Sequence, residues 1–158
     1  MFVADLHNDI VQRAMNGEDV SKLTNVGHTD LIRLIKSCID LEIFIVWVSN
    51  ISSEKSSFQK ANAMCNKIED LAKNHRLVVI PRSLDEILEN KKNNFLSIPI
   101  AMEGGEAIEN SLDKLHHFIE RGIFYFGPTW NHSLDWVSSG YDEVNNKKKI
   151  KQIGLSKF

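Results

Sequence analysis

The chain has 158 residues, of which 42% are hydrophobic and 25% are charged, and its formal net charge is −2 at pH 7. This length and composition predict one globular domain, residues 1–158, with a core of its own. The small negative charge gives no reason to expect nucleic acid as a partner. No apolar run approaches the roughly 18 residues of a membrane span, so no membrane contact is expected either. The first residues lack the basic and apolar regions of a signal peptide, and we therefore expect a cytoplasmic protein.

Short apolar runs alternate with amphipathic segments along the chain. Runs rich in β-branched and aromatic residues predict strands, and apolar residues at three- and four-residue steps predict helices. Continuous apolar strands separated by helices indicate an α/β fold with a parallel sheet that helices cover. The expected strands are residues 2–6, 41–48, 77–80, 95–102 and 123–126, and the expected helices are residues 9–15, 28–35, 53–74, 83–91 and 111–120.

Two of these helices begin with recognisable caps. Ser83-Leu84-Asp85-Glu86 fits a capping box with Ser83 as the cap, and Ser111 is suited to cap the helix that ends before Gly122. Along the helix over residues 53–74, the apolar side chains form one stripe that is expected to face the core. Residues 137–153 are polar and charged, and we expect them to form a mobile loop.

Two predicted strand ends carry possible metal ligands. His7 and Asp9 follow the first apolar run, and residues i and i+2 of an extended strand point to one face, where an imidazole and a carboxylate can bind one cation together. Glu103 ends another apolar run, and Gly104-Gly105 behind it permits a sharp turn. Because function in a βα barrel gathers at the carboxyl ends of the strands, we predict a metal site formed by His7, Asp9 and Glu103. The alternative is that Asp9 only caps the helix that follows it.

With these motifs in place, the chain resembles the N-terminal half of the renal (membrane) dipeptidases, a family of zinc-dependent (β/α)8-barrel enzymes that hydrolyse dipeptides. The resemblance runs from residue 3 to the last residue and implies a partial (β/α)8 TIM-type barrel of about the first five βα units. It is carried by Asp5-Leu6-His7-Asn8-Asp9, His28-Thr29-Asp30-Leu31-Ile32-Arg33-Leu34, Ser83-Leu84-Asp85-Glu86-Ile87, Ala101-Met102-Glu103-Gly104-Gly105 and Thr129-Trp130-Asn131-His132.

The resemblance implies that His7 and Asp9 bind one zinc ion and that Glu103 is the catalytic carboxylate bridging two zinc ions. The family's second zinc site uses two histidines from later strands, and an aspartate near the last strand assists the reaction. These groups have no counterpart in this sequence, so at most one weakly held ion is expected here.

The resemblance also implies roles for the loop after residue 126 and marks one departure from the family. Some members have a substrate-contacting histidine at the position of Trp130, and others have Trp there. We therefore expect Trp130, Asn131 and His132 to contact the substrate. The departure is Ser37-Cys38, which stands where many members have a Gly-Gly pair after the second helix.

Three functions remain open. The first is a zinc-dependent dipeptidase in a truncated or incomplete form, inactive alone, which binds a dipeptide once a C-terminal half completes it. The second is a catalytically dead half-barrel remnant that acts as a dimerising or interaction module. The third, another metal-dependent hydrolase of the amidohydrolase kind, is disfavoured because those enzymes typically open with an HxH pair where this chain has Asp9. A partial barrel leaves open strand edges, so we expect a homo-oligomer.

Overall fold

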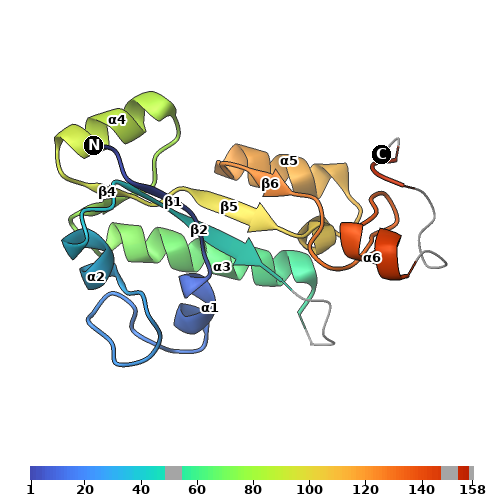
Figure 1. The fold of residues 1–158 in the computed structure, drawn as a ribbon, viewed down its shortest axis with the longest axis horizontal. Coiled ribbons are helices and arrows are strands. Elements are labelled where there is room, and N and C mark those ends of the chain that lie inside the picture. The colour runs from blue at the N-terminus through green and yellow to red at the C-terminus, as the bar shows by residue number, and fades with distance from the viewer. Residues whose placement is uncertain (49–54, 147–152, 157–158) are drawn as a thin grey trace.

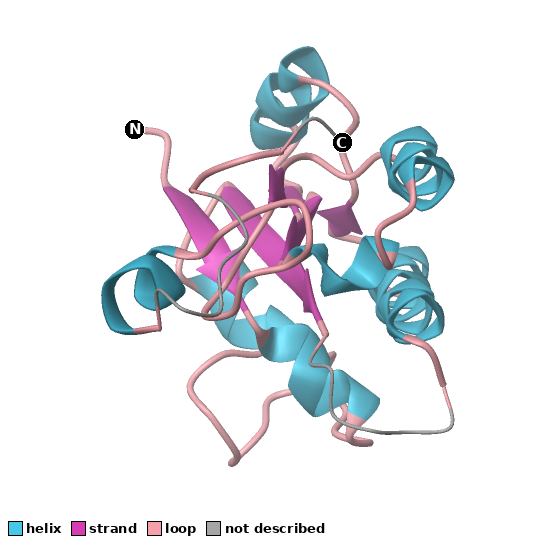
Figure 2. Ribbon diagram, turned by 90° about the vertical axis from the view of Figure 1, so that its right-hand side faces the viewer, coloured by secondary structure: helices cyan, strands magenta, loops and turns pink. Residues whose placement is uncertain are grey.

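The computed structural model describes residues 1–48, 55–146 and 153–156 and contains a curled parallel sheet with helices around it (Figures 1 and 2). The strands are β1 (Ala4–Asn8), β2 (Leu41–Trp47), β3 (Val78–Val79), β4 (Leu96–Ser97), β5 (Ile100–Glu103) and β6 (Phe126–Gly127). The helices are α1 (Ile10–Met15), α2 (Leu31–Lys36), α3 (Ser57–Lys73), α4 (Leu84–Lys92), α5 (Leu112–Arg121) and α6 (Gly140–Asn145), with a 3-10 turn η1 (Gly105–Ile108).

The six strands of the described sheet pair in parallel, in the order β3, β4, β2, β5, β6, and β1 pairs with β2 beside this path. The carboxyl ends of these strands therefore lie along the same edge. This arrangement confirms the expected α/β fold as a partial TIM-type barrel. The short strand β4 pairs with the beginning of β2, and β3 pairs with β4 alone. Strand β3 therefore does not lie between β2 and β5.

The expected single strand over residues 95–102 is two strands, because Ile98 and Pro99 separate β4 from β5. Proline has no backbone N–H to donate to a neighbouring strand. Its carbonyl still takes part in the sheet, since Phe44 N donates to Pro99 O at 3.0 Å. The chain then continues as β5 and reaches Glu103 at the edge of the sheet.

An irregularity interrupts the pairing of β1 with β2. Ala4 pairs with Leu41, but Asn8 pairs with Phe44, so β1 contains one residue more than the stretch of β2 beside it. This is a β-bulge, which changes the direction of the side chains that follow. The bulge lies directly before the end of β1, where His7 is located.

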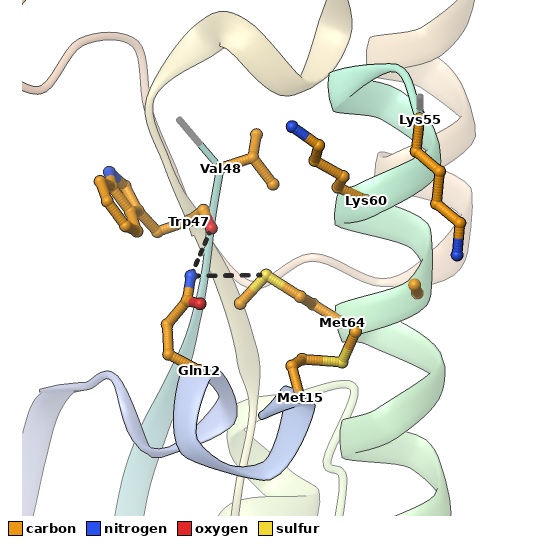
Figure 3. A pocket seen from close by; sticks show the side chains of 8 residues that line it. Gln12, Met15, Trp47, Val48, Lys55, Lys60 and Met64 are labelled. Carbon is orange, nitrogen blue, oxygen red and sulfur yellow. Dashed lines mark hydrogen bonds between the residues drawn. The ribbon is translucent and has the colours of Figure 1, made fainter. Parts of the chain in front are cut away.

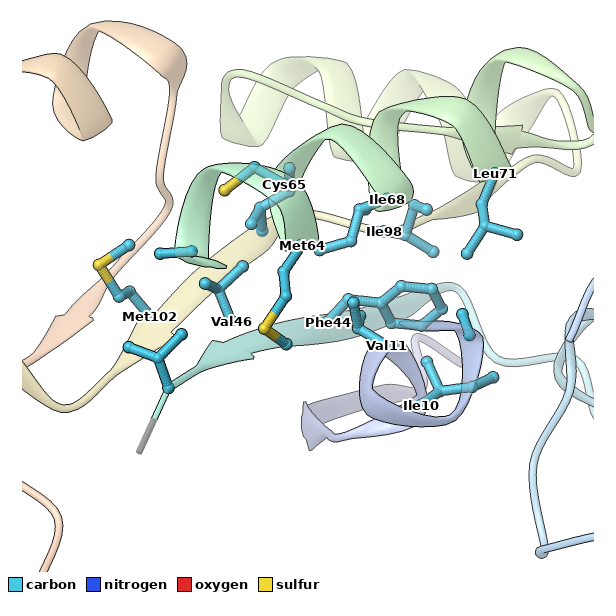
Figure 4. Close-up of a cluster of buried hydrophobic side chains, with 14 of the residues drawn as sticks. Ile10, Val11, Phe44, Val46, Met64, Cys65, Ile68, Leu71, Ile98 and Met102 are labelled. Carbon is cyan, nitrogen blue, oxygen red and sulfur yellow. The ribbon is translucent and has the colours of Figure 1, made fainter. Parts of the chain in front are cut away.

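One face of the sheet forms the main core with α3. Met64, Ile68 and Leu71 of α3 pack in one cluster with Phe44 and Val46 of β2 (Figure 4). The predicted core-facing stripe is thereby confirmed. Helix α3 begins later than expected, after the Ser56 cap with its reciprocal Gln59 contact. The first two residues of the expected helix lie outside the described ranges.

The opposite face of β2 carries a second, smaller cluster. It joins β2 to Ala101 of β5 and Ile87 of α4, and Trp47 packs against it; its β2 members are Leu41, Ile43 and Ile45. Because side chains alternate along a strand, Glu103 shares the face of Ala101. We call this surface the α4-side face. It is opposite the α3 core.

The predicted helix ends are confirmed in most details. Ser111 caps α5, and the helix ends at Gly122, whose φ of +93° lies in the left-handed region. Ser83 caps α4 by accepting from Glu86 N at 3.2 Å. The reciprocal contact is displaced by one residue, because the Glu86 carboxylate accepts from Arg82 N at 2.7 Å and not from Ser83.

The prediction of a loop over residues 137–153 is wrong for its first part, which contains α6. Ser139 caps this helix, accepting from Asp142 N at 3.1 Å, and Asp142 accepts from Ser133 N at 2.7 Å. Polar contacts of this kind leave no apolar periodicity in the sequence. Residues 147–152 lie outside the described part. Among the helices that are described, none has the length and hydropathy needed to cross a bilayer.

Candidate metal centre

His7, Asp9 and Glu103, here called the trio, meet at the carboxyl edge of the sheet. His7 lies in β1, Asp9 precedes α1, and Glu103 is the last residue of β5. The Nε2 atom of His7 is 3.7 Å from Asp9 Oδ1 and 3.7 Å from Glu103 Oε2. One donor atom of each residue lies within 4.8 Å of the other two. Within the described ranges, this is the one group of His, Cys, Asp and Glu residues with such spacing.

The donor set fits a divalent metal ion. Zinc binds histidine nitrogen and carboxylate oxygen at about 2.0–2.2 Å in tetrahedral geometry, so two of its ligand atoms are about 3.4 Å apart. The two 3.7 Å distances in the trio are close to that value. One imidazole and two carboxylates can together bind either a borderline or a hard divalent cation. The spacing of the three donor atoms is thus compatible with one ion bound between them.

Asp9 does not act as the helix cap that the alternative interpretation required. Its carboxylate makes no capping hydrogen bond to α1, and the neighbouring Asn8 provides one by accepting from Ile10 N at 2.9 Å. The prediction that an extended strand places His7 and Asp9 on one face is only partly right. Strand β1 ends at Asn8, and Asp9 has φ −87° and ψ 18°, which is not extended. The turn into α1 therefore brings the two side chains together.

Glu103 is the half-buried member of the trio. Partial burial raises the pKa of Glu103, His7 opposes that shift, and the carboxylates of Asp9 and Glu106 add to it. A nearby cation would reverse this balance by favouring the charged carboxylate. Directly after Glu103, Gly104 adopts φ +87°, which confirms the sharp turn expected there.

Tyr125 is a neighbour of the trio that sequence reasoning missed. Its hydroxyl donates to Leu6 O of β1 at 2.8 Å, across the strands between them. Burial raises the pKa of Tyr125, and the charges of Glu103 and Asp9 raise it further. In the sequence Tyr125 lies near the end of the strand expected over residues 123–126, so the strand-end rule could have indicated it, although in the structure it directly precedes β6.

An aromatic pair lies beside Glu103. Trp47 is paired in register with Glu103 on the neighbouring strand, and it contacts Trp130 edge to face, with ring centroids 5.1 Å apart and planes at 83°. Figure 3 shows the Trp47 ring pointing away from Met64 and α3. A separate pocket of about 220 Å³ lies between the end of β2 and α3. In it, the Gln12 side chain donates to Trp47 O at 2.9 Å.

The other two residues expected at the substrate are placed differently from Trp130. The carbonyl of Asn131 accepts from the Ser139 hydroxyl at 2.9 Å, which ties this loop to α6. His132 is exposed and lies near Asp142 of α6, whose pKa is lowered mainly by the hydrogen bond from Ser133 N, with a smaller contribution from His132. The structure therefore brings Trp130 to the α4-side face but does not bring His132 into the trio.

Comparison with known proteins identifies the family of this chain. A family model described as membrane dipeptidase (peptidase family M19) matches residues 1–158. An uncharacterised protein of Acinetobacter calcoaceticus, from the PQQ-III 3′ region, is 36% identical over an aligned length of 155, and the match covers 82% of this chain and 49% of that protein.

Two solved structures share the fold. Dipeptidase AC, a metallopeptidase of family M19, has a TM-score of 0.76 at 24% identity, and the match covers 87% of this chain and 45% of that one. A metallopeptidase of Rhodobacter sphaeroides, bound to a phosphinate mimic of L-Ala-D-Ala, has a TM-score of 0.78 at 21% identity, covering 87% and 48%. The chain thus spans about half the length of the relatives that it matches. Since the family model matches the chain from end to end, this protein belongs to the membrane dipeptidase family, peptidase family M19.

Proposed function

We propose that this protein provides the N-terminal part of a zinc-dependent dipeptidase site, in which His7, Asp9 and Glu103 hold a divalent metal ion. The observation that carries the proposal is the convergence of these three donors, from two strand ends and a helix start, at 3.7 Å spacings. Functional groups of TIM-type barrels gather at this edge of the sheet. With three protein ligands, we expect at most one weakly held zinc ion per chain.

The proposed reaction is hydrolysis of a dipeptide. His7, Asp9 and Glu103 would hold the metal ion, and the chemistry that it would supply is a water activated as a nucleophile at neutral pH. In this scheme Glu103 accepts a hydrogen bond from the attacking water, and His7 and Asp9 complete the protein's share of the ligands. Trp130 and Trp47 offer an apolar wall to a substrate side chain, and Asn131 and His132 extend the binding loop. Groups supplied by a C-terminal half complete the site, so the isolated chain is proposed to be inactive.

A second candidate function is an interaction module built on the half-barrel. It is favoured by β1, four of whose five residues are exposed although they belong to a strand. An exposed strand edge is a template for pairing with another chain. Under either function we propose one domain over residues 1–158, a cytoplasmic location, a homo-oligomer, and no nucleic acid or membrane as partner.

Zinc binding tests the proposed site. We expect isothermal titration of the metal-free protein to give at most one zinc ion per chain, and His7→Ala or Glu103→Gln to weaken binding at least tenfold. His116→Ala is the matched control, because it removes an exposed histidine of α5 and should leave binding unchanged. Unchanged binding in both site variants would overturn the proposed centre, and two tightly retained ions would show that further ligands exist.

A further inference from the structure

A buried carboxyl group contacts Asn8, the residue between His7 and Asp9 of the trio. Glu42 of β2 is 1% exposed, and its Oε2 atom has no hydrogen-bond partner in the described part of the chain. Its other oxygen, Oε1, accepts a hydrogen bond from the Asn8 side-chain amide. Burying a carboxyl group is costly unless its contacts compensate, so the position of Glu42 needs an explanation.

The explanation lies in what Asn8 does with its other side-chain atom. While its amide nitrogen donates to Glu42, its Oδ1 accepts from Ile10 N at 2.9 Å, in the first turn of α1. Asn8 therefore links β2 to the start of α1. The residues on its two sides are His7 and Asp9, so the link holds the backbone from which both side chains project.

This link acts where the backbone has little other support. The bulge removes regular pairing between Asp5 and Asn8, and α1 has only six residues. Short helices gain little stability from their own hydrogen bonds. A change in the Asn8 conformation would rotate the turn and separate the His7 and Asp9 donor atoms.

We propose that Glu42 is a positioning residue of the metal centre, which acts through Asn8 to hold the turn between β1 and α1 in the conformation that directs His7 and Asp9 toward Glu103. This inference rests on the proposed metal site and deepens it. Glu42 itself does not contact the ion. Its role matches that of the outer hydrogen-bond partners that orient metal ligands, whose loss typically lowers metal affinity by about 10- to 100-fold.

The test compares zinc affinity with folding stability in matched variants. Glu42→Leu removes the acceptor and keeps an apolar side chain in the buried space, whereas Glu42→Gln keeps a side-chain oxygen that accepts from Asn8. Asn8→Ala cuts the link from the other end. We expect Glu42→Leu and Asn8→Ala to weaken zinc binding by about 10-fold or more and Glu42→Gln to stay within about threefold of the parent protein.

Two further readouts separate positioning from a general loss of structure. Urea unfolding in EDTA identifies conditions in which every variant is folded, and zinc titration is performed there. The visible absorption of bound cobalt(II) reports ligand geometry, and we expect it to change in Glu42→Leu and Asn8→Ala but not in Glu42→Gln. Should Glu42→Leu not fold, Asn8→Ala decides the question.

Three outcomes would count against the proposal. An Asn8→Ala variant with the zinc affinity and cobalt spectrum of the parent protein would overturn the proposal. Equal weakening of zinc binding by Glu42→Gln and Glu42→Leu would also overturn it, because the Gln amide retains the hydrogen bond to Asn8. In both cases loss of binding in His7→Ala would leave the proposed function standing. Normal binding in His7→Ala and Glu103→Gln would instead show that the metal site itself is misassigned.

Discussion

The Nε2 atom of His7 and the Oε2 atom of Glu103 are 3.7 Å apart, although β2 lies between the strands that carry them. In a flat sheet, two strand spacings of about 4.8 Å would separate their backbones by about 10 Å. The two side chains bridge this separation by extending toward each other above β2, and the curl of the sheet brings them closer. The Tyr125 hydroxyl, which reaches Leu6 O from the other end of the strand order, indicates the same curvature. The candidate metal centre is thus a product of the barrel geometry.

The first prediction concerns catalysis. We expect the 158-residue protein to show no detectable hydrolysis of a small dipeptide panel in the presence of zinc. Cooperating catalytic groups lose most of their rate when one member is missing, and this sequence lacks counterparts to the family's later ligands. Activity should appear when a C-terminal half of a family member is added, and Glu103→Gln should remove it. Turnover by the protein alone that vanishes in Glu103→Gln would contradict this expectation but support the site.

The second prediction concerns self-association. Strand β1 pairs with β2 alone among the described strands, and Leu6 on it is 60% exposed. We expect size-exclusion chromatography with light scattering to detect dimers or larger species. Leu6→Lys should shift the protein toward the monomer, because a charged side chain on an edge strand disfavours pairing. Leu84→Lys is the control, since Leu84 is 66% exposed on α4. A parent protein that stays monomeric at high concentration would disprove the prediction.

The third prediction concerns pH. Burial raises the pKa of Glu42 from 4.5 to about 7, and the nearby Asp5 charge adds to the shift. A pKa raised by folding gives stability that is present below pH 4.5 and is lost as the pH rises through 7. The unfolding free energy should therefore decrease between pH 5 and pH 8, by about 3 kcal/mol at most. We expect Glu42→Gln to lack most of this decrease in urea unfolding at the two pH values.

Glu103, whose pKa burial also raises, contributes to a decrease in the same direction, so the difference between the parent protein and Glu42→Gln is the quantity that reports on Glu42. The carboxylates with lowered pKa values do not contribute in this range. Asp19, Glu109 and Asp142 have pKa values lowered to about 2, mainly by hydrogen bonds to lysines or to backbone N–H groups. The stability that they contribute is present above their unfolded pKa and is lost only as the pH falls toward 2. A parent protein and a Glu42→Gln variant with the same slope between pH 5 and pH 8 would show that Glu42 is not the titrating group.

The fourth prediction concerns the turn after α2. Cys38 has φ +59°, a left-handed conformation that costs a residue with a Cβ atom about 1–2 kcal/mol. Glycine adopts this conformation freely but loses more entropy on folding. We expect Cys38→Gly to raise the unfolding free energy by up to about 1 kcal/mol in urea titrations. Cys38→Ala, which keeps the Cβ atom, should bring no such gain. A destabilising Cys38→Gly would show that the thiol contributes more than the strain.

The trio comes together as its position at predicted strand ends in the sequence indicated. Its local geometry, by contrast, depends on which side chain accepts from the first N–H groups of α1, and the sequence does not determine this. Asn and Asp are about equally good at accepting from the first N–H groups of a helix, so the sequence could not show that Asn8 accepts from Ile10 N and leaves the Asp9 carboxylate available. Pro99, by contrast, carried a usable signal, because proline is rare within central strands.

Neighbours of the trio were missed for a different reason. The contact between Trp47 and Trp130 joins residues that are far apart in the chain, and no local pattern indicates it. Glu42 was detectable in principle, since it is the one charged residue in the apolar run over residues 41–48. A charge in such a run indicates either an exposed position or a buried hydrogen-bonded group, and only the tertiary structure distinguishes the two.

The bulge in β1 has a consequence for protein engineering. A shift of one residue in strand register turns every following side chain to the opposite face. If the His7-Asn8-Asp9 segment were transplanted into an idealised barrel with regular strands, its imidazole would point to the face of the sheet opposite Glu103. A designer who copies the site must therefore copy the extra residue between Ala4 and Asn8 together with the ligands. For the same reason, single-residue deletions in this stretch should be tolerated far less well than substitutions.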